Sequence, residues 1–334
     1  MKQVWIRKNG KAETLRIEEK ADYTNDLQEN QVLIDVHYSG INFADIIMRL
    51  GLYKDAPKKP YVPGYEVSGI IQAIGPGVKD FEVGDQVISG SLFGGYSSQI
   101  VVEQDLVFKL PKHLSLEQGA ALPVSLITVN AALVDMGRIR KGDRVLIDCA
   151  TGGIGIIALQ LCQKVGAETI GLTSSPDKLS LIESYGAKGL THDQFWASEK
   201  NNQFDFILNS EGGRSVRKHY DRLSSTGRVV AFGMSAAIKD GVRSYRKALK
   251  TILSMPWFSL VSMFDRNRGV FALNALKLLE DPHYKKGLAA KIKNSEELEI
   301  TPLVGGVFKA EDVAKAHRFL EAKKAKGKVL LSWK

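Results

Sequence analysis

The chain is poor in cysteine and has no long apolar run. Its 334 residues include two cysteines, Cys149 and Cys162, so a disulfide framework and a cage of cysteine metal ligands are both excluded. No segment reaches the roughly 18 uncharged apolar residues that a membrane-crossing helix needs. The opening MKQVWIRKNG lacks an apolar signal core. We therefore expect a cytoplasmic protein of about two domains.

Positive charge is concentrated in one part of the chain. Between Arg214 and Lys250, ten basic residues face two acidic ones, a net charge of +8 within a chain of net charge +9. The uncharged segment Thr251–Phe264, TILSMPWFSLVSMF, follows directly. Such a pair of segments is typical of a contact with anionic lipid, of a pocket mouth for an apolar substrate and an anionic cofactor, or of a solvated basic face beside a core or interface helix. The residues leave all three open.

A nucleotide-binding unit is indicated by residues 144–175. The apolar run Val145–Cys149 is typical of a buried strand, and Gly152, Gly153 and Gly155 follow at once. A helical segment and a second strand come next. Glycines at a strand-to-helix turn let the backbone approach a diphosphate, which the free N–H groups of the helix bind. The unit predicts a dinucleotide pocket.

The end of the second strand indicates which dinucleotide binds. An NAD site usually places Asp or Glu there, whereas this chain has the hydroxyls of residues 173–175 and then Lys178. Ser174 and Lys178 are suited to a 2′-phosphate, which favours NADPH over NADH. The alternative is structural: Ser175 caps a helix that begins at Pro176, and Lys178 lies on a solvated face.

The order of the predicted elements indicates an α/β fold. Up to Pro123, short strand patterns alternate with turns, as in a β-barrel. From Val124, strands at RVLIDCA, ETIGLTS, FDFILNS and RVVAFGM alternate with helical segments, as in a doubly wound parallel sheet. The final apolar strand, KVLLSW, needs a sheet to join. We expect it to return to the first domain.

Several segments carry a resemblance to a known family. These are GINFADIIMRLGLY, PGYEVSG, FEVGDQV, LPVSLITVNAAL, CATGGIG and KGKVLLSW, in order along the chain. Together they resemble the zinc-independent quinone oxidoreductases of the medium-chain dehydrogenase/reductase superfamily, and NFADIIMRLGLY with NRGVF is most similar to the vesicle amine transport protein-like subfamily. The resemblance implies a GroES-like catalytic domain at 1–123 and 273–334, split around a Rossmann NADPH-binding domain at 124–272, and a homodimer paired through Rossmann sheet edges.

The resemblance also bears on metal binding. Asn42 and Tyr65 stand where the superfamily's alcohol dehydrogenases place a zinc-binding Cys and His. Neither is a plausible zinc ligand, and Glu66 cannot hold zinc alone. We expect no metal at this site. Without a Lewis acid, an already electrophilic acceptor is favoured as substrate, either a quinone or an α,β-unsaturated carbonyl.

Asn42, Asp45 and Tyr53 are the predicted catalytic residues. We expect the Asn42 amide to donate to the acceptor oxygen, although a turn or cap role is the alternative. Asp45 and Arg49 share a helical face with it, and we expect an ion pair between them that holds Asn42 in place, with acid catalysis by Asp45 as the alternative. Tyr53 is suited to hydrogen bonding or proton relay, or to packing against the barrel.

The remaining cofactor contacts are implied by the resemblance. Thr128 matches a threonine behind the nicotinamide, and two further segments match loops that line the nicotinamide and its ribose. The predicted cofactor-binding residues are Thr128, Thr151, Gly152, Gly153, Ile154, Gly155, Ser174, Lys178, Phe232, Gly233, Met234, Val270 and Phe271. Asn130 and Asp193 depart from relatives that carry Tyr at or near these positions.

The sequence indicates two alternative functions. The first is an NADPH-dependent reductase of a small-molecule quinone or enone. The second is a catalytically weak reductase-like protein that acts mainly by cofactor-dependent binding at a membrane surface. We expect no nucleic-acid partner.

Overall fold

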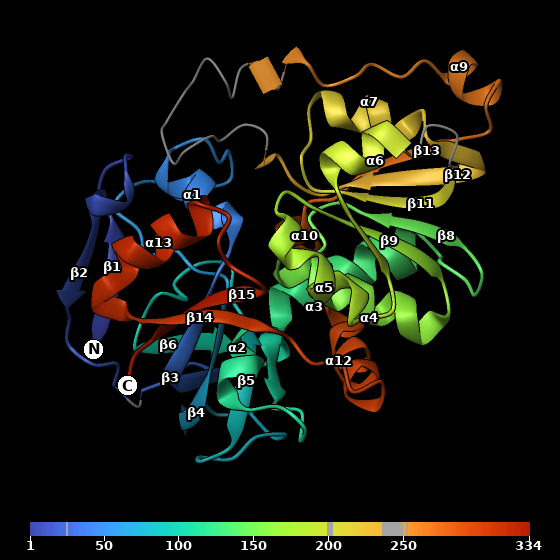
Figure 1. Ribbon diagram of the computed structural model, residues 1–334. Helices are drawn as coiled ribbons and strands as arrows, with labels where there is room; N and C mark the ends of the chain where they lie inside the picture. The colour runs from blue at the N-terminus through green and yellow to red at the C-terminus, as the bar shows by residue number, and fades with distance from the viewer. Residues whose placement is uncertain (25, 199–202, 236–249, 252) are drawn as a thin grey trace. The chain divides into compact units, whose positions relative to one another are not determined.

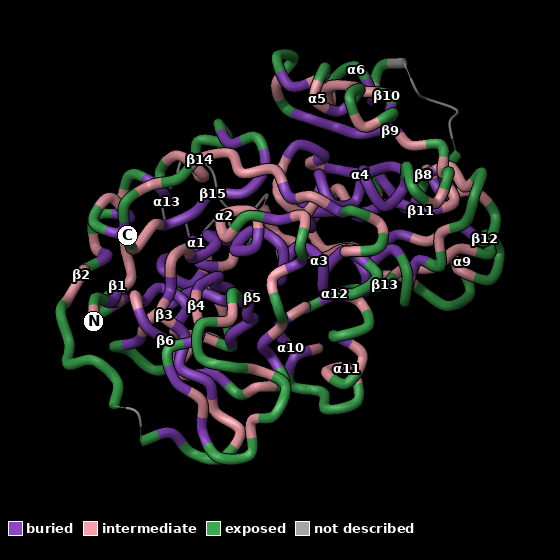
Figure 2. Tube along the Cα trace, turned by 90° about the horizontal axis from the view of Figure 1, so that it is seen from below, coloured by how far each residue is buried: buried purple, intermediate pink, exposed green. Residues whose placement is uncertain are grey.

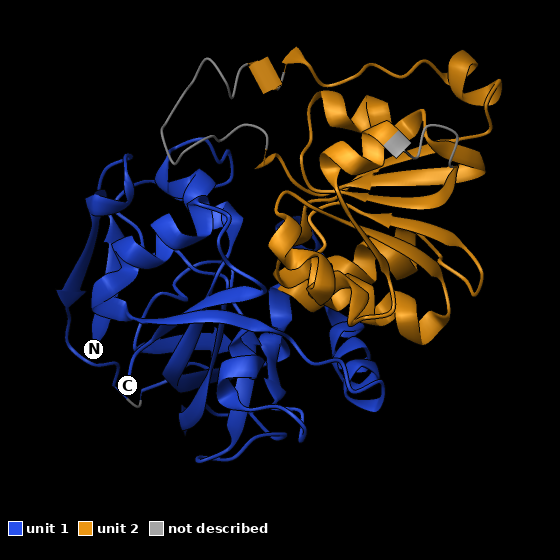
Figure 3. Cartoon of the chain, viewed as in Figure 1, with its two compact units in different colours: residues 1–124, 240–243, 276–334 blue, residues 125–239, 244–275 orange. Residues whose placement is uncertain are grey.

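The computed structural model describes residues 1–24, 26–198, 203–235, 250–251 and 253–334. The chain divides into two compact units (Figure 3). Unit 1 comprises residues 1–124 and 276–334, and unit 2 comprises residues 125–235, 250–251 and 253–275 of the described chain. Each unit has its own buried apolar clusters. Among the described residues no helix has both the length and the apolar character needed to cross a bilayer.

Unit 1 is built on one large, mostly antiparallel sheet. Its strand order is β14-β15-β3-β4-β5-β7, with β6 also paired to β3, while β1 and β2 form a separate hairpin. The strands are β1 (Lys2–Ile6), β2 (Leu15–Glu19), β3 (Gln31–Ile41), β4 (Glu66–Ile74), β5 (Gln86–Gly90), β6 (Gln99–Glu103), β7 (Val107–Lys109), β14 (Val304–Lys309) and β15 (Lys328–Ser332). The barrel-like, β-rich first domain predicted from the sequence is confirmed.

The last strand returns to this sheet. β15 pairs antiparallel with β3, placing Val329 opposite Ile41, and parallel with β14. Its residues Val329, Leu330 and Leu331 are fully buried, which explains why so apolar a segment needs a partner on each side. The expectation that the final strand joins the first domain is confirmed.

The helices of unit 1 are short. They are η1 (Ala12–Thr14), α1 (Phe43–Arg49), η2 (Gln104–Leu106), α2 (Leu116–Ala120), α10 (Ala275–Glu280), α11 (Pro282–Lys286), α12 (Leu288–Glu297), η6 (Ala310–Asp312) and α13 (Val313–Glu321). α13 buries Val313, Ala316 and His317 and packs against α1, β14 and β15 (Figure 1). This packing places α1 beside the buried end of β3.

Unit 2 is a doubly wound parallel sheet, as the sequence predicts. Its order is β10-β9-β8-β11-β12-β13, and every neighbouring pair runs parallel. The strands are β8 (Arg144–Ile147), β9 (Glu168–Thr173), β10 (Lys188–Thr191), β11 (Phe204–Asn209), β12 (Leu223–Ala231) and β13 (Gly269–Ala272). The strand order reverses between β8 and β11, and ligands of such sheets bind at this switch point.

The helices of unit 2 cover the strands that they connect. They are α3 (Pro123–Val129), the π-helical segment η3 (Asn130–Met136), α4 (Gly153–Val165), η4 (Pro176–Lys178), α5 (Leu179–Glu183), α6 (His192–Ser198), α7 (Arg214–Tyr220) and α9 (Leu260–Phe264). α4 packs on β8 and β9, and α7 packs on β11 and β12. Figure 2 shows α4 as mostly buried.

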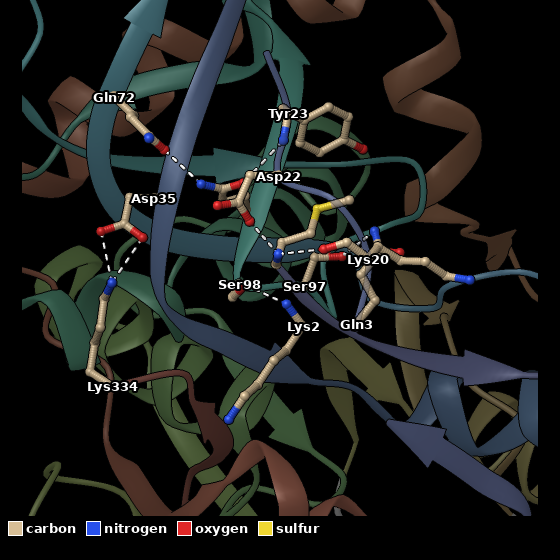
Figure 4. A network of polar contacts seen from close by, with 12 residues as sticks. Lys2, Gln3, Lys20, Asp22, Tyr23, Asp35, Gln72, Ser97, Ser98 and Lys334 are labelled. Atoms are coloured by element: carbon tan, nitrogen blue, oxygen red, sulfur yellow. Dashed lines mark hydrogen bonds and ion pairs between the residues drawn. The ribbon is translucent and has the colours of Figure 1, made fainter. Parts of the chain in front are cut away.

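A surface network of polar contacts joins distant parts of unit 1 (Figure 4). Lys334 Nζ lies 2.8 Å from both carboxylate oxygens of Asp35 on β3, and the Lys2 backbone N–H donates to Ser98 Oγ at 2.8 Å. Exposed ion pairs contribute about 0–1 kcal/mol. The network therefore positions these segments more than it stabilises the fold.

Candidate functional site

Asn42 lies in a buried network of charged groups in unit 1. It directly precedes α1, at the N-cap position, and its side chain is almost fully buried. Its Nδ2 donates to Glu66 Oε1 at 2.9 Å, and its Oδ1 accepts from Lys328 Nζ at 2.6 Å. Lys328 Nζ also lies 2.5 Å from Glu66 Oε1. The second Glu66 oxygen accepts the Val124 backbone N–H at 2.8 Å.

This arrangement fixes the orientation of the Asn42 amide. The ion pair between Lys328 and Glu66 is buried, and such a pair persists only where further hydrogen bonds satisfy its atoms. Asn42 supplies one bond to each partner, which uses one of its two amide hydrogens. The Lys328 cation on Oδ1 withdraws electron density from the amide, so the remaining N–H is a stronger donor. The sequence indicated no role for Lys328. It indicated for Glu66 only that this residue is retained from the zinc site of related alcohol dehydrogenases.

The donors around Asn42 do not fit a zinc ion. The Tyr65 hydroxyl donates to Met48 Sδ at 3.2 Å, and burial raises the pKa of Tyr65 far above its usual value. Both Glu66 oxygens are engaged by the contacts described above. Zinc needs deprotonated or neutral lone-pair donors that converge on one point. Asn42, Tyr65 and Glu66 offer no such set.

Asp45 caps its own helix and does not pair with Arg49, so the predicted ion pair between them is wrong. Asp45 Oδ2 accepts the Asn42 backbone N–H at 2.8 Å and the Tyr96 hydroxyl at 3.1 Å. Arg49 lies one turn further along α1 and pairs through Nη2 with Glu321 on α13. The carboxylate turns back toward the helix N-terminus, where unpaired N–H groups attract it. Asp45 still holds Asn42, but through the backbone.

Asp45 belongs to a buried polar cluster. Burial raises its pKa to about 7, although the Asn42 N–H and the Tyr96 hydroxyl act in the opposite direction. The Tyr96 hydroxyl also lies 3.2 Å from His317 Nε2. Burial and the nearby Arg49 lower the pKa of His317 to about 3, so this imidazole is neutral. A carboxyl group with a pKa near neutrality thus lies directly behind Asn42.

We expect the Asp45→Asn variant to differ from the wild type most clearly in how its free energy of unfolding depends on pH. The folded wild type binds the Asp45 proton more tightly than the unfolded chain between about pH 4 and 7, because the pKa rises from 3.8 to about 7 on folding. Wild-type stability should therefore fall relative to the variant as pH rises through this window, by no more than about 1.4 kcal/mol per pH unit. Denaturant unfolding at each pH measures this difference.

The control for this series is Asp26→Asn, at an exposed position of unit 1. It removes one carboxyl group without disturbing the buried cluster. A flat profile for Asp45→Asn would contradict a raised Asp45 pKa.

Tyr53 lies in a partly buried position against the apolar cluster that contains Tyr65 and Met48. Burial raises the pKa of the Tyr53 phenol, so the group is protonated at neutral pH. Tyr53 therefore packs against this cluster and also carries a proton that it can donate. Its catalytic role stays a prediction.

The glycine turn of unit 2 joins β8 to α4. Gly152 is the N-cap of α4, Thr151 before it is buried, and Gly153 and Ile154 are half-buried in the first turn. A Cβ at Gly155 would lie 2.5 Å from the Ala150 carbonyl, so no larger residue fits there. The first-turn N–H groups of a helix lack partners within it. This is the local geometry of a diphosphate cradle.

The end of β9 carries hydroxyls and no acid. Thr173 is buried, Ser174 is exposed, and Ser175 is the N-cap of η4, whose first residue is Pro176 as predicted. The Ser175 hydroxyl donates to Asp177. Lys178 is buried, so the alternative that places it on a solvated face is wrong. Ser174 remains directed to the surface.

The other predicted cofactor residues of unit 2 are dispersed over three elements. Thr128 is buried in α3, and residues 232–234 follow β12, where the Phe232 N–H donates to Asn209 O at 3.0 Å. Val270 and Phe271 lie in the edge strand β13 and not in a loop, which corrects that prediction. They are in a strand because residues 269–272 pair in register with β12.

The two residues that depart from relatives have structural positions of their own. Asn130 is buried at the start of η3 and donates from Nδ2 to the Leu126 carbonyl at 3.1 Å. Asp193 is exposed in the first turn of α6. Neither supplies the aromatic hydroxyl of those relatives.

Two family models match the chain. The alcohol dehydrogenase GroES-like domain matches residues 28–112, and the zinc-binding dehydrogenase family matches residues 187–331. They cover the barrel strands of unit 1 and much of the parallel sheet of unit 2.

Curated relatives align along most of the chain. The synaptic vesicle membrane protein VAT-1 homologues of Danio rerio and Rattus norvegicus are each 30% identical, over 92% and 90% of this chain. The chain spans 65% and 76% of their respective lengths. The quinone oxidoreductase of Sus scrofa is 28% identical over 91% of this chain and 89% of its own.

A solved structure shows the same fold. The Escherichia coli quinone oxidoreductase, complexed with NADPH, superposes with a TM-score of 0.85 at 24% identity, covering 99% of this chain and 100% of that one. The parallel sheet and glycine turn of unit 2 have the arrangement of a Rossmann fold. The chain belongs to the medium-chain dehydrogenase/reductase superfamily, in the branch that contains the quinone oxidoreductases and the VAT-1 homologues.

Proposed function

We propose that this protein reduces quinones or α,β-unsaturated carbonyl compounds with NADPH, without zinc. The observation that carries the proposal is the buried Asn42, which Lys328 and Glu66 hold in place of a zinc-ligand set. A polarised amide is a suitable partner for an oxygen that becomes negative during hydride addition. It is a poor substitute for the Lewis acid that alcohol oxidation uses.

NADPH supplies the hydride when it is bound. The residues present fit this cofactor, because Gly155 keeps the turn free of a side chain and the exposed Ser174 can donate to a 2′-phosphate. The first turn of α4 would hold the diphosphate. Thr128, Phe232–Met234, Val270 and Phe271 are proposed to line the nicotinamide half.

The chain's own residues orient and polarise the acceptor. The Asn42 amide would donate to the acceptor oxygen and stabilise the enolate or quinol anion. Lys328 is a positioning residue, because it acts through the Asn42 oxygen and not on the substrate. Tyr53, protonated at neutral pH, is proposed to return a proton to the product.

The function is tested by NADPH oxidation against short quinones, enals and enones in the presence of a chelator. We expect turnover with at least one of these acceptors and none with simple alcohols and NADP⁺. Cofactor binding is measured separately by titration. Tight NADPH binding with no turnover on any acceptor would contradict the reductase proposal.

We expect Lys178→Ala to weaken NADPH binding by about 1–3 kcal/mol and to leave NADH binding nearly unchanged, as for a charge-assisted hydrogen bond to a 2′-phosphate. The matched control is Lys164→Ala, at an exposed position near the far end of α4. Calorimetric titration with both cofactors gives the two affinities. Equal losses for NADPH and NADH would count against the assignment of Ser174 and Lys178 to the 2′-phosphate.

A homodimer is proposed as the assembly. β13 is an edge strand of the unit 2 sheet, and Phe271 on it is 41% exposed, so a second copy has backbone groups to pair with. Light scattering gives the mass in solution.

A second candidate function is binding at a membrane surface. Five large apolar side chains between residues 253 and 264 are more than two-thirds exposed, among them Trp257 at 95% and Phe264 at 73%. Lys250 and Arg266, at either end of this segment, are exposed. Exposed apolar groups flanked by cations are typical of segments that enter an anionic lipid interface. The predicted basic residues Lys239, Arg243, Arg246 and Lys247 lie outside the described residues.

Sedimentation with vesicles tests this candidate. We expect binding to phosphatidylcholine vesicles that contain phosphatidylserine, and a loss of roughly 10-fold or more for Trp257→Ser or Phe264→Ser, since burying such a side chain is worth about 1.5–3 kcal/mol. Val83→Ser, at an exposed apolar position of unit 1, is the control. Protein that stays in the supernatant at low salt would contradict the membrane proposal and support a cytoplasmic location.

A further inference from the structure

A second group of chemically active side chains lies at the carboxyl edge of the unit 2 sheet. Asp148 follows β8, His192 follows β10 and begins α6, and Glu211 follows β11 after one residue. One ligand atom from each lies within 4.8 Å of the others. Asp148 and Glu211 flank the switch point between β8 and β11, the region of such sheets where ligands bind.

The contacts within this group leave Asp148 incompletely satisfied. Its side chain is fully buried, and its Oδ1 has no hydrogen-bond partner among the described residues. His192 Nε2 lies 3.6 Å from that oxygen, which is longer than a hydrogen bond. The Ser210 hydroxyl lies 3.5 Å from the other carboxylate oxygen, Asp148 Oδ2. A buried carboxylate oxygen without a partner is costly and needs an explanation.

The electrostatics of the group favour a cation. Asp148 and Glu211 each offer a carboxylate oxygen, and His192 offers an imidazole nitrogen, to the same small volume. A divalent cation among them would neutralise both charges and fill the coordination of the orphaned oxygen.

We propose that Asp148, His192 and Glu211 form a divalent transition-metal site at the carboxyl edge of the unit 2 sheet. The imidazole among the ligands favours Zn²⁺, Co²⁺ or Mn²⁺ over Mg²⁺ or Ca²⁺, which prefer oxygen alone. Ligand atoms about 2.0–2.2 Å from an ion lie about 3–3.5 Å apart, so the group must close slightly around it. His192 and Glu211 are half-buried, whereas Asp148 is buried.

Cobalt binding tests the site. The chelator-treated full chain is titrated with Co²⁺, followed by calorimetry and by visible absorption, and we expect one saturable site for each chain. His192→Gln and Glu211→Gln, at half-buried positions that tolerate the change, should each weaken binding by at least about 10-fold, since even residues that only hydrogen-bond to a metal ligand are worth roughly 10–100-fold. Asp148→Asn should do the same, with its fold checked by circular dichroism.

The matched control is His37→Gln. His37 Nε2 lies 3.8 Å from one carboxylate, that of Asp35, with no second acid in the group, and Co²⁺ binding should be unchanged. The absence of a saturable site, or equal affinity in the wild type and in both the His192→Gln and Glu211→Gln variants, would overturn the proposal. Neither outcome depends on turnover, so the test is independent of the proposed reductase activity.

Discussion

We expect Lys328→Met to lower the free energy of unfolding by about 3–5 kcal/mol, the usual cost of removing one partner from a buried ion pair. The substitution leaves the Glu66 carboxylate buried, with the Asn42 amide and the Val124 N–H as its remaining partners. Methionine is similar in length and is apolar, so the loss reflects charge and not a cavity. Urea unfolding of the wild type and the variant measures the difference.

The double variant Glu66→Gln with Lys328→Met shows how much of the loss comes from leaving one buried charge without its partner. Once both charges are removed, we expect recovery of a large part of the stability, because apolar or neutral replacements of a buried pair are often close to neutral. The control is Lys2→Met, which removes an exposed partner of Glu311 and should cost about 1 kcal/mol or less. A loss below about 1 kcal/mol for Lys328→Met itself would contradict a buried, interdependent network.

The second large effect concerns catalysis. We expect Asn42→Ala to lower kcat by roughly 10- to 1,000-fold while NADPH affinity stays within a few-fold, as for other single oxyanion donors. The Asn42 amide is held on one side by Glu66 and on the other by Lys328, so no neighbouring donor can take its position without breaking an ion pair. Steady-state kinetics on the best acceptor and a separate cofactor titration give the two quantities.

Folding must be controlled in this experiment. Asn42 is also the N-cap of α1, and loss of a cap costs about 1 kcal/mol, which can imitate a catalytic defect. Ser115→Ala, which removes the N-cap hydroxyl of α2, is the matched control and should lose stability without losing turnover to the same extent. Wild-type turnover in a folded Asn42→Ala protein would contradict the oxyanion role.

Much of the fold could be predicted because its signals are local. The glycine turn lies within one strand–helix unit, and the apolar runs of β8, β9, β11 and β12 are long enough to indicate buried strands. β10 and β13 were not predicted as strands. Each has four residues and includes a glycine, which is too short a pattern to indicate a strand, so the pairing with a neighbouring strand determines it.

The candidate site could be predicted only in part, because its contacts join residues that are far apart in the sequence. Asn42 was identified from its motif, but its partner Lys328 lies 286 residues away, and only the pairing of β15 with β3 brings the two together. The predicted Asp45–Arg49 pair failed because spacing along a helix does not reveal that α13 offers Glu321 to the arginine. The Asp148, His192 and Glu211 group also depends on the order of three strands.

We propose that this chain transfers a hydride from NADPH to an electrophilic acceptor. The most direct measurement uses NADPH carrying deuterium at the transferable position and an α,β-unsaturated carbonyl acceptor, with the product examined by mass spectrometry and NMR. We expect one deuterium, at the β-carbon of the reduced product. NADPH oxidation that yields a product without deuterium, or no oxidation with any acceptor by a protein that binds NADPH, would contradict it.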